Sequence, residues 1–328
     1  MAAPPQHPFV YIDAAALHSL LPFPSLIAHL RASLAHPDLA AGIECPQRVS
    51  LPLPTAPSAA LLLMPSWCAH PSLPYLALKA ITSLPSNAPR LPSVHGAVSL
   101  FSSTTGIPLA SIEGSALTLL RTAAVSALAA SLLVPTSRPP SVLALAPYLV
   151  EAHLAALPSI SRVLVWNRTR SKSAALAARL RDAHPGLAVE EAGAMDEAVA
   201  AADIVSCATR SEEPIVRGEL LRPGAHLDLV GSFRPAMREC DDEALRRGRV
   251  FIDFEAAMEE AGELVGAVQH GVMRRSDVAG TLAELAAGTV EGRRGDDEIT
   301  VFKSVGTAVV DLLAAQLAYE HSCSAGSG

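Results

Sequence analysis

Three basic side chains in the first part of the chain could bind a small carboxylate. Lys79 interrupts the apolar stretch YLALKAIT, Arg121 lies within LTLLRTAAVS, and Arg48 begins RVSLPLP. A charge in apolar surroundings is costly unless it is paired or functional. If the three cations converge, they would bind a carboxylate and could polarise a C=N bond. The alternative is ordinary ion pairing, for instance with Glu113 or Glu44.

Three other residues in apolar stretches are also candidates for a site. His95, in SVHGAV, is a candidate substrate-binding residue, and the alternative is a hydrogen-bonded histidine of the core. Asp311, in GTAVVDLLAA, either faces the substrate cleft or pairs with a cation, and we favour pairing. Ser304 is predicted to be the N-cap of the helix in this stretch, whose amides would face a ligand.

The stretch WNRTRSKS follows an apolar run, VLVW, that is typical of a strand. In a nucleotide-binding domain, an acidic residue at the end of the second strand binds the ribose 2′-hydroxyl, whereas arginine accommodates a 2′-phosphate. Asn167, Arg168, Thr169 and Arg170 offer donors and positive charge without an acid, which favours NADPH over NADH. The alternative is a solvated loop in which Thr169 or Ser171 is a helix N-cap.

The stretch just before it, SVLALAPYLVEAHLAAL, should then contain the first strand, a glycine turn and the first helix. It contains no glycine. Glycines in that turn let backbone amides approach the pyrophosphate of a dinucleotide. Pro147 can start the helix but contributes no N–H. We expect impaired cofactor binding, and the alternative is an altered, short turn that still presents enough amides.

The elements that must position these residues fall into two parts. Up to residue 134, short extended runs are separated by Pro and Ser, a helix is expected over residues 25–36, and a long helix covers ALTLLRTAAVSALAASLLV. PTSRPP is the clearest linker. Beyond it, apolar strands alternate with segments of helix length, which predicts a parallel sheet covered on both faces. The closing helix, after EITVFKSVG, is expected to pack back on the first part.

Composition excludes several classes of function. Half of the 328 residues are apolar, the net charge is -7 and no basic tract occurs, so nucleic acid and membrane are poor partners. The five cysteines have neither CxxC nor metal-ligand spacing, which indicates reduced thiols and no metal site. There is no signal-peptide pattern, no uninterrupted apolar run that could span a bilayer, and no HExxH, GxSxG or GxxxxGK[ST] motif.

Taken together, the motifs resemble the ornithine cyclodeaminase/mu-crystallin family over nearly the whole chain. They are LLLMPSW, YLALKAIT, FSSTTGIPLASIEG, LTLLRTAAVSALA, VLVWNRT, DIVSCAT, HLDLVGSFRPAMRECDD and ITVFKSVGTAVVDLLAAQ. LLLMPSW, SLFSSTTG and HLDLVGSF are most similar to plant members that form pipecolate by reducing a cyclic ketimine.

The resemblance implies a fold class: α/β, with a Rossmann-type, doubly wound parallel sheet plus an α+β substrate and dimerisation domain. The substrate and dimerisation domain would comprise residues 1–134 and 302–328, and the Rossmann-type domain would comprise residues 135–301. A homodimer would form through the substrate domain. The resemblance gives catalytic and substrate-carboxylate roles to Arg48, Lys79 and Arg121, and cofactor contacts to Asn167, Arg168, Thr169, Thr209 and Ser304. His95 and Phe233 are further candidate substrate-binding residues, and Ser232 is a further candidate cofactor contact.

One departure separates the branches of the family. Cyclodeaminases have an aspartate in a VGxDxPGK-like setting, and Phe233 stands at the position of that acid. Phenylalanine cannot relay protons, so ornithine cyclisation with loss of ammonia is disfavoured and the reductase branch is favoured.

The expected function is therefore NADPH-dependent reduction of a cyclic ketimine carboxylate, with NADH as the second choice of cofactor. Δ1-Piperideine-2-carboxylate would give pipecolate, and the five-membered analogue would give proline. Lys79 is the candidate proton donor, because an iminium accepts hydride far more readily than an imine. The alternatives are a non-catalytic protein that binds a small ligand and, less favoured, an ornithine cyclodeaminase. The plant resemblance suggests the plastid, and the cytosol is the alternative.

Overall fold

The computed structural model describes residues 9–54, 56, 58–87, 90–145 and 149–325. The chain divides into two compact units: unit 1 comprises residues 1–121 and 307–328, and unit 2 comprises residues 122–306. The sequence placed the first boundary at the Pro-rich linker after residue 134. The division instead falls inside the long helix α4 (Gly114–Leu133), because this helix continues from one unit into the other.

Unit 1 is built on a seven-stranded sheet with the order β1-β7-β6-β5-β4-β2, in which β3 also pairs with β4. Its pairs are antiparallel except for β1 with β7. Its strands are β1 (Val10–Ile12), β2 (Ile43–Glu44), β3 (Val49–Pro52), β4 (Ala60–Cys68), β5 (Tyr75–Ser83), β6 (Val94–Ser102) and β7 (Pro108–Glu113), and its helices are α1 (Ala14–Leu20), α2 (Phe23–Ala35), α3 (Pro37–Gly42) and α12 (Ala308–Ala325).

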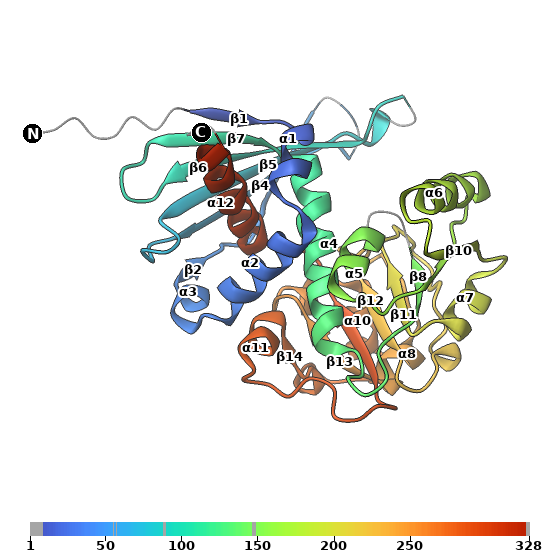
Figure 1. Ribbon diagram of the computed structural model, residues 1–328. Helices are drawn as coiled ribbons and strands as arrows, with labels where there is room; N and C mark the ends of the chain where they lie inside the picture. Colours follow the sequence, from blue (N-terminus) through green and yellow to red (C-terminus); the bar gives the residue numbers. More distant parts are fainter. Residues whose placement is uncertain (1–8, 55, 57, 88–89, 146–148, 326–328) are drawn as a thin grey trace, which may run out of the picture. The chain divides into compact units, whose positions relative to one another are not determined.

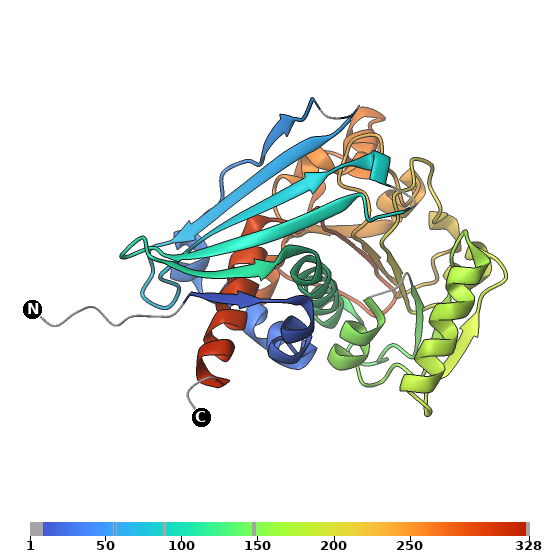
Figure 2. The same ribbon diagram turned by 90° about the horizontal axis from the view of Figure 1, so that it is seen from above.

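One face of this sheet is covered by α12, which lies against β4, β5 and β6 (Figures 1 and 2). Side chains alternate between the faces of a strand, and in β4 the buried residues are Met64, Ser66 and Cys68. The Ser66 hydroxyl donates to the Ala308 carbonyl at 2.9 Å, which ties the start of α12 to the sheet. The C-terminal helix α12 is therefore part of the core of unit 1.

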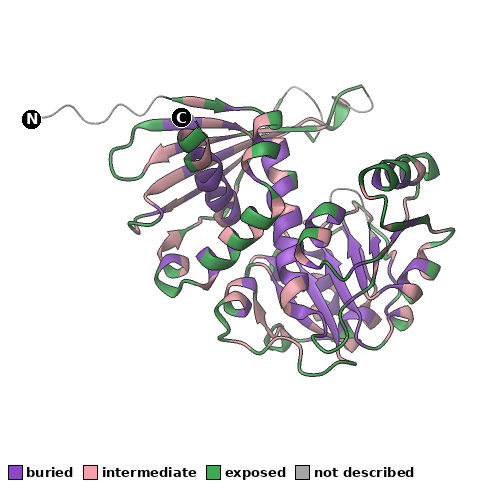
Figure 3. Cartoon of the chain, in the orientation of Figure 1, coloured by how far each residue is buried: buried purple, intermediate pink, exposed green. Residues whose placement is uncertain are grey.

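Unit 2 contains eight parallel strands with the order β10-β9-β8-β11-β12-β15-β13-β14, as the sequence predicted. Figure 3 shows that its central strands are buried. The order reverses between β8 and β11, where doubly wound sheets bind nucleotides at the carboxyl ends of the strands. The strands are β8 (Val142–Leu145), β9 (Arg162–Val165), β10 (Ala188–Glu191), β11 (Ile204–Cys207), β12 (His226–Leu229), β13 (Gly248–Ile252), β14 (Gly280–Thr281) and β15 (Ile299–Lys303).

The helices of unit 2, besides the end of α4, connect these strands. They are α5 (Leu149–Ala156), α6 (Arg170–Ala183), α7 (Met195–Ala201), α8 (Asp242–Arg247), α9 (Ala257–Glu260), α10 (Gly262–Gln269) and α11 (Leu282–Ala287). Strand β8 ends at Leu145 and α5 begins at Leu149, so the predicted helix start at Pro147 lies outside the described residues.

The prediction that Ser304 is the N-cap of the last helix is wrong, because α12 begins at Ala308. The residues between adopt a loop that binds a carboxylate of the chain itself. Asp253 Oδ2 accepts hydrogen bonds from the Ser304 hydroxyl at 2.7 Å and from the amides of Val305 and Gly306 at 3.1 and 2.8 Å. The amides expected to face a ligand are thus satisfied by a side chain.

Helix α4 is long and apolar enough, by length and composition, to cross a membrane. However, 72% of its most apolar window is buried inside the protein. That burial is typical of a core helix in a globular fold, and Arg121, in the middle of α4, has its partner within unit 1.

Candidate functional site

A buried cluster of charges in unit 1 brings together two of the predicted cations. Lys79, on β5, donates from Nζ to Asp311 Oδ1 at 2.9 Å, and Arg121 Nε donates to the same oxygen at 3.0 Å. Lys79 is 1% exposed, Arg121 6% and Asp311 1%. The expectation that Asp311 pairs with a cation is confirmed. Among the ion pairs of the described residues, one carboxylate serves both cations, which leaves the cluster with an excess positive charge.

The alternative that the cations pair with Glu113 is wrong. This carboxylate accepts hydrogen bonds from the amides of Ser115 at 3.1 Å and Ala116 at 2.6 Å, so it caps the start of α4. Arg48, in the loop between β2 and β3, is half-buried, and its charge acts on Lys79. The structure thus brings Arg48 within electrostatic reach of Lys79.

The environment of Lys79 lowers its pKa to about 8. Burial is the main cause, because it disfavours the charged amine, and the charges of Arg121 and Arg48 act in the same direction. Asp311 opposes them. The Asp311 carboxyl is itself buried, yet the charges of Arg121 and Lys79 hold its pKa below the usual value. Lys79 therefore has an acidity suited to proton donation near neutral pH.

His95 is not part of this cluster. In the pairing of β5 with β6, Lys79 lies opposite Val98 and Thr82 lies opposite His95. An odd-numbered step along β5 separates Lys79 from Thr82, so the side chains of Lys79 and His95 lie on opposite faces of the sheet. His95 is exposed, so its alternative interpretation as a core histidine is wrong.

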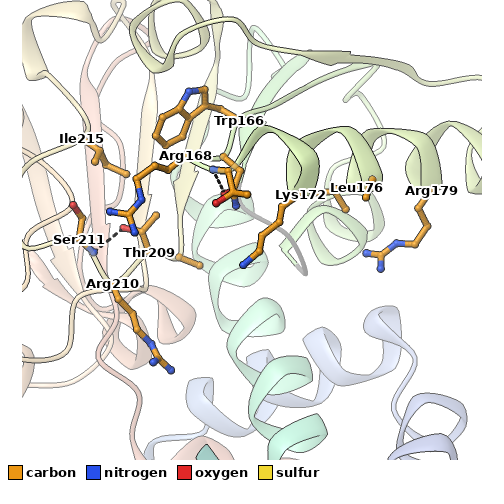
Figure 4. Close-up of a pocket in the computed structure, with 13 residues that line it drawn as sticks. Trp166, Arg168, Lys172, Leu176, Arg179, Thr209, Arg210, Ser211 and Ile215 are labelled. Carbon is orange, nitrogen blue, oxygen red and sulfur yellow. Dashed lines mark hydrogen bonds between the residues drawn. The ribbon is translucent and has the colours of Figure 1, made fainter. Parts of the chain in front are cut away.

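Unit 2 contains a cavity of about 790 Å³ at the ends of β9 and β11, next to the start of α6 (Figure 4). Its lining includes four of the predicted cofactor contacts: Asn167, Arg168, Thr169 and Thr209. The Asn167 side chain accepts from the Thr169 amide at 2.9 Å and so shapes this loop. Thr169 stands at the N-cap position of α6, as the alternative interpretation proposed. Its side chain makes no capping hydrogen bond.

Four cations line this cavity: Arg168, Lys172, Arg179 and Arg210. Lys172 and Arg179 project from α6, whereas Arg210 follows β11 (Figure 4). Within the part of the chain that the structure describes, none of the four has an acidic partner at ion-pair distance. Unpaired cations around a cavity attract an anion, and guanidinium groups match phosphate oxygens in geometry. The cavity therefore fits the phosphorylated adenosine end of a dinucleotide.

Three of these cations, Lys172, Arg179 and Arg210, were not identified from the sequence. Lys172 and Arg179 are seven positions apart, two turns of α6, and this spacing was a usable signal. Arg210 directly follows Thr209 at the end of the stretch DIVSCAT, so its position after a strand was also visible. Two further predicted contact residues follow β12: Ser232 is buried, and the half-buried Phe233 ring lies 5.5 Å from the Arg234 guanidinium.

Comparison with known proteins gives consistent results over the length of the chain. Residues 16–326 match the family model described as Ornithine cyclodeaminase/mu-crystallin family. Protein SAR DEFICIENT 4 of Arabidopsis thaliana is 46% identical over 318 residues, covering 95% of this chain and 97% of that protein. Delta(1)-pyrroline-2-carboxylate reductase of Colwellia psychrerythraea is 35% identical over 319 residues, covering 94% and 98%.

A solved structure shares the fold over 97% of this chain. It is that of Thermococcus litoralis Delta(1)-pyrroline-2-carboxylate reductase in complex with NADH and L-proline. The TM-score is 0.88 at 28% sequence identity, and the match covers 97% of this chain and 98% of that one. The predicted fold class, a Rossmann-type sheet with a second α+β domain, is confirmed.

Proposed function

Because this chain belongs to the ornithine cyclodeaminase/mu-crystallin family, we propose that it is a reductase that uses a nicotinamide cofactor to reduce the C=N bond of a cyclic 2-carboxylate. The observation that carries this proposal is the buried cluster of Lys79, Arg121 and Asp311, which has an excess positive charge and a lysine of lowered pKa. Relatives that act on a five-membered cyclic imine support the reaction type.

In the mechanism that we propose, Arg48 and Arg121 hold the substrate carboxylate. Lys79 donates a proton to the imine nitrogen or keeps it protonated, so that the imine carbon can accept hydride. The C=N bond becomes a C–N single bond, with one hydrogen added to each atom. Asp311 keeps Lys79 charged and oriented until the proton is needed, since its carboxylate raises the pKa of the amine.

For the cofactor we propose NADPH, with NADH as the second choice. When bound, it supplies the hydride. Arg168, with Asn167 and Thr169, would hold the adenosine 2′-phosphate, and Lys172 and Arg210 add positive charge to the same cavity. Thr209 and Ser232, at the carboxyl ends of β11 and β12, would contact the cofactor further along. Ser304, whose hydroxyl donates to Asp253, would also contact the cofactor.

We propose Δ1-piperideine-2-carboxylate as the substrate and pipecolate as the product, with the five-membered ring as the second choice. The resemblance to the plant members supports the larger ring, whereas the relatives whose names state a substrate act on the five-membered ring. The test is to follow NADPH oxidation with both rings. Ammonia release from ornithine without net NADPH oxidation would identify a cyclodeaminase, and ligand binding without cofactor binding would identify a non-catalytic protein.

Arg168→Ala is expected to weaken NADPH binding much more than NADH binding. Loss of one charge-assisted phosphate contact costs about 1.5–3 kcal/mol, or roughly 10- to 150-fold in dissociation constant. Trp166 lines the cavity, so quenching of its fluorescence in a Trp67→Phe background measures binding in unit 2. The matched control is Arg246→Ala, which removes an exposed arginine paired with Glu243. Equal losses for both cofactors would contradict the role in 2′-phosphate binding.

We also propose a homodimer formed through the sheet of unit 1. The sheet face opposite α12 carries half-buried Trp67, Leu76, Leu78 and Phe101, which line an apolar cavity of about 720 Å³. Apolar patches of this kind are typical of protein–protein contacts. Light scattering should give twice the mass of one chain, and Leu78→Glu should give a monomer. Leu91→Glu, at an exposed leucine in a loop, is the control, and a monomeric parent protein would exclude the dimer.

The similarity to a plant protein at 46% identity, with the resemblance to plant family members, leads us to propose the plastid as the compartment. Imaging of a fluorescent fusion in plant cells tests this proposal, and a cytosolic signal would contradict it.

A further inference from the structure

A buried carboxylate joins the ends of the two central strands of unit 2. Glu239 is 0% exposed. Its Oε1 accepts from the amide and the hydroxyl of Thr209, just after β11, at 2.6 and 3.0 Å. Its Oε2 accepts from the amides of Gly231 and Ser232, just after β12, at 2.7 and 3.3 Å. One side chain thus holds both strand ends.

The two strand ends approach so closely that position 231 must be glycine. A Cβ atom at Gly231 would lie 2.0 Å from the Thr209 carbonyl oxygen, 2.2 Å from the Thr209 nitrogen and 2.4 Å from Glu239 Oε1. These distances are far below van der Waals contact. There is therefore no space for a side chain where the backbone of Gly231 meets the backbone of Thr209 and the Glu239 carboxylate.

The main chain of Glu239 is also fixed by hydrogen bonds. Its backbone carbonyl accepts from the amides of Ile215 and Val216 at 3.0 and 2.9 Å. Ile215 lines the cation-rich cavity of unit 2. Hydrogen bonds to the main chain of Glu239 thus help to fix the carboxylate, in addition to the four hydrogen bonds that the carboxylate accepts.

The charge of Glu239 is balanced by a buried lysine. Lys303, at the end of β15, is 0% exposed, and its Nζ lies 3.8 Å from Glu239 Oε2 and 3.0 Å from Glu263 Oε1. Glu263 is also 0% exposed, and its other oxygen accepts from the Ser232 hydroxyl. Glu263 therefore contacts a side chain at the strand end but none of the backbone amides that Glu239 holds.

The four donors require an ionised carboxylate. An ionised carboxylate is acceptor-only, so it can satisfy four donors at once, whereas a protonated one would direct a hydrogen toward another donor. Burial raises the pKa of Glu239, and the charge of Lys303 opposes that effect. A glutamine at this position would match the shape but would place an NH₂ group against N–H donors on one side.

We propose that Glu239 is a positioning residue for the nicotinamide end of the cofactor, because it fixes the Gly231–Ser232 segment against Thr209, which lines the cavity assigned to the adenosine end. This inference rests on the proposed function for the identity of the cofactor. Glu239 acts through the two strand ends and does not itself contact the reacting atoms.

The test is Glu239→Gln, which leaves the buried Lys303–Glu263 pair in balance and so favours folding. We expect kcat to fall about 10- to 100-fold, since small misplacements of reacting groups have effects of this size. Adenosine 2′,5′-bisphosphate should still bind within a few-fold of the parent protein, because its phosphates meet the cations of the cavity, which the substitution leaves unchanged, and the Glu239 carboxylate reaches this lining through Thr209. If NADPH binds the parent protein more tightly than the fragment does, most of that difference in affinity should be lost in the variant.

The matched control is Glu263→Gln, a buried Glu→Gln change beside the same lysine. It should lower kcat at most a few-fold and preserve the advantage of NADPH over the fragment. Equal effects of the two variants, or a parallel loss of fragment binding and kcat in Glu239→Gln, would overturn the proposal in favour of a general structural role.

A measurement on the unaltered protein keeps the proposal testable if Glu239→Gln does not fold. Hydrogen exchange without cofactor should show that the amides of Thr209, Gly231 and Ser232 are protected, because the strand ends are arranged before binding. Fast exchange of these amides would overturn the inference. Failure of the proposed function is distinguishable: if NADPH binds but no ketimine is reduced, the affinity comparison still decides the role of Glu239, and if NADPH does not bind, both fall.

Discussion

Lys79→Met is expected to lower kcat about 100- to 10,000-fold at saturating NADPH and substrate, the usual range for removal of a general acid. Methionine has nearly the length of lysine and fills the buried space on β5, and Asp311 keeps Arg121 as a partner. The variant therefore removes the proton donor with little disturbance of packing. Unchanged turnover would remove Lys79 from the mechanism.

The pH dependence gives a second check of the same residue. The pKa of Lys79 is lowered to about 8, so its acid form predominates below that pH and is lost above it. The kcat/KM of the parent enzyme should fall as pH rises through about 8, and Lys79→Met should lack this fall. NADPH binding, followed by Trp166 in unit 2, is the control and should not change, because Lys79 belongs to unit 1.

Several parts of the site could be predicted because a charge in an apolar stretch is a strong signal. Lys79 and Arg121 were identified in this way, as was the pairing of Asp311 with a cation. Lys303, in the strand ITVFK, carries the same signal and was overlooked. The parallel order of unit 2 could be predicted because apolar strands alternate with helices.

Other parts depend on contacts between distant segments, which one sequence does not display. Glu239 lies in the charged stretch MRECDDE, which is typical of a solvated surface, yet the fold buries it completely. His95 shares an apolar strand with buried residues, and only the register with β5 reveals that it faces away from Lys79. Ser304 precedes a helix, but the binding of Asp253 to residues 304–306 delays the helix start.

Asp311→Asn is expected to lower the free energy of unfolding by about 3–5 kcal/mol, as removal of one partner of a buried ion pair does. The substitution leaves Lys79 and Arg121 buried with no carboxylate at hydrogen-bonding distance among the contacts described for them. Urea unfolding followed by Trp67 in a Trp166→Phe background measures the effect in unit 1. The control, Glu320→Gln on the exposed side of α12, should change stability by less than about 0.5 kcal/mol.

The destabilisation by Asp311→Asn should also depend on pH, with a sign set by the lowered pKa of Lys79. Asp311 raises that pKa, so the variant has a still lower one, and its folded state must give up a proton or bury an unpaired charge. The part of the loss due to Lys79 is therefore fully present at low pH and disappears as pH rises through about 8, where the amine is neutral in both folded proteins. The part due to Arg121 persists, because guanidinium stays charged. A loss that is independent of pH would mean that Asp311 stabilises the fold through Arg121 alone, and Lys79 would then be free to act as a proton donor without it.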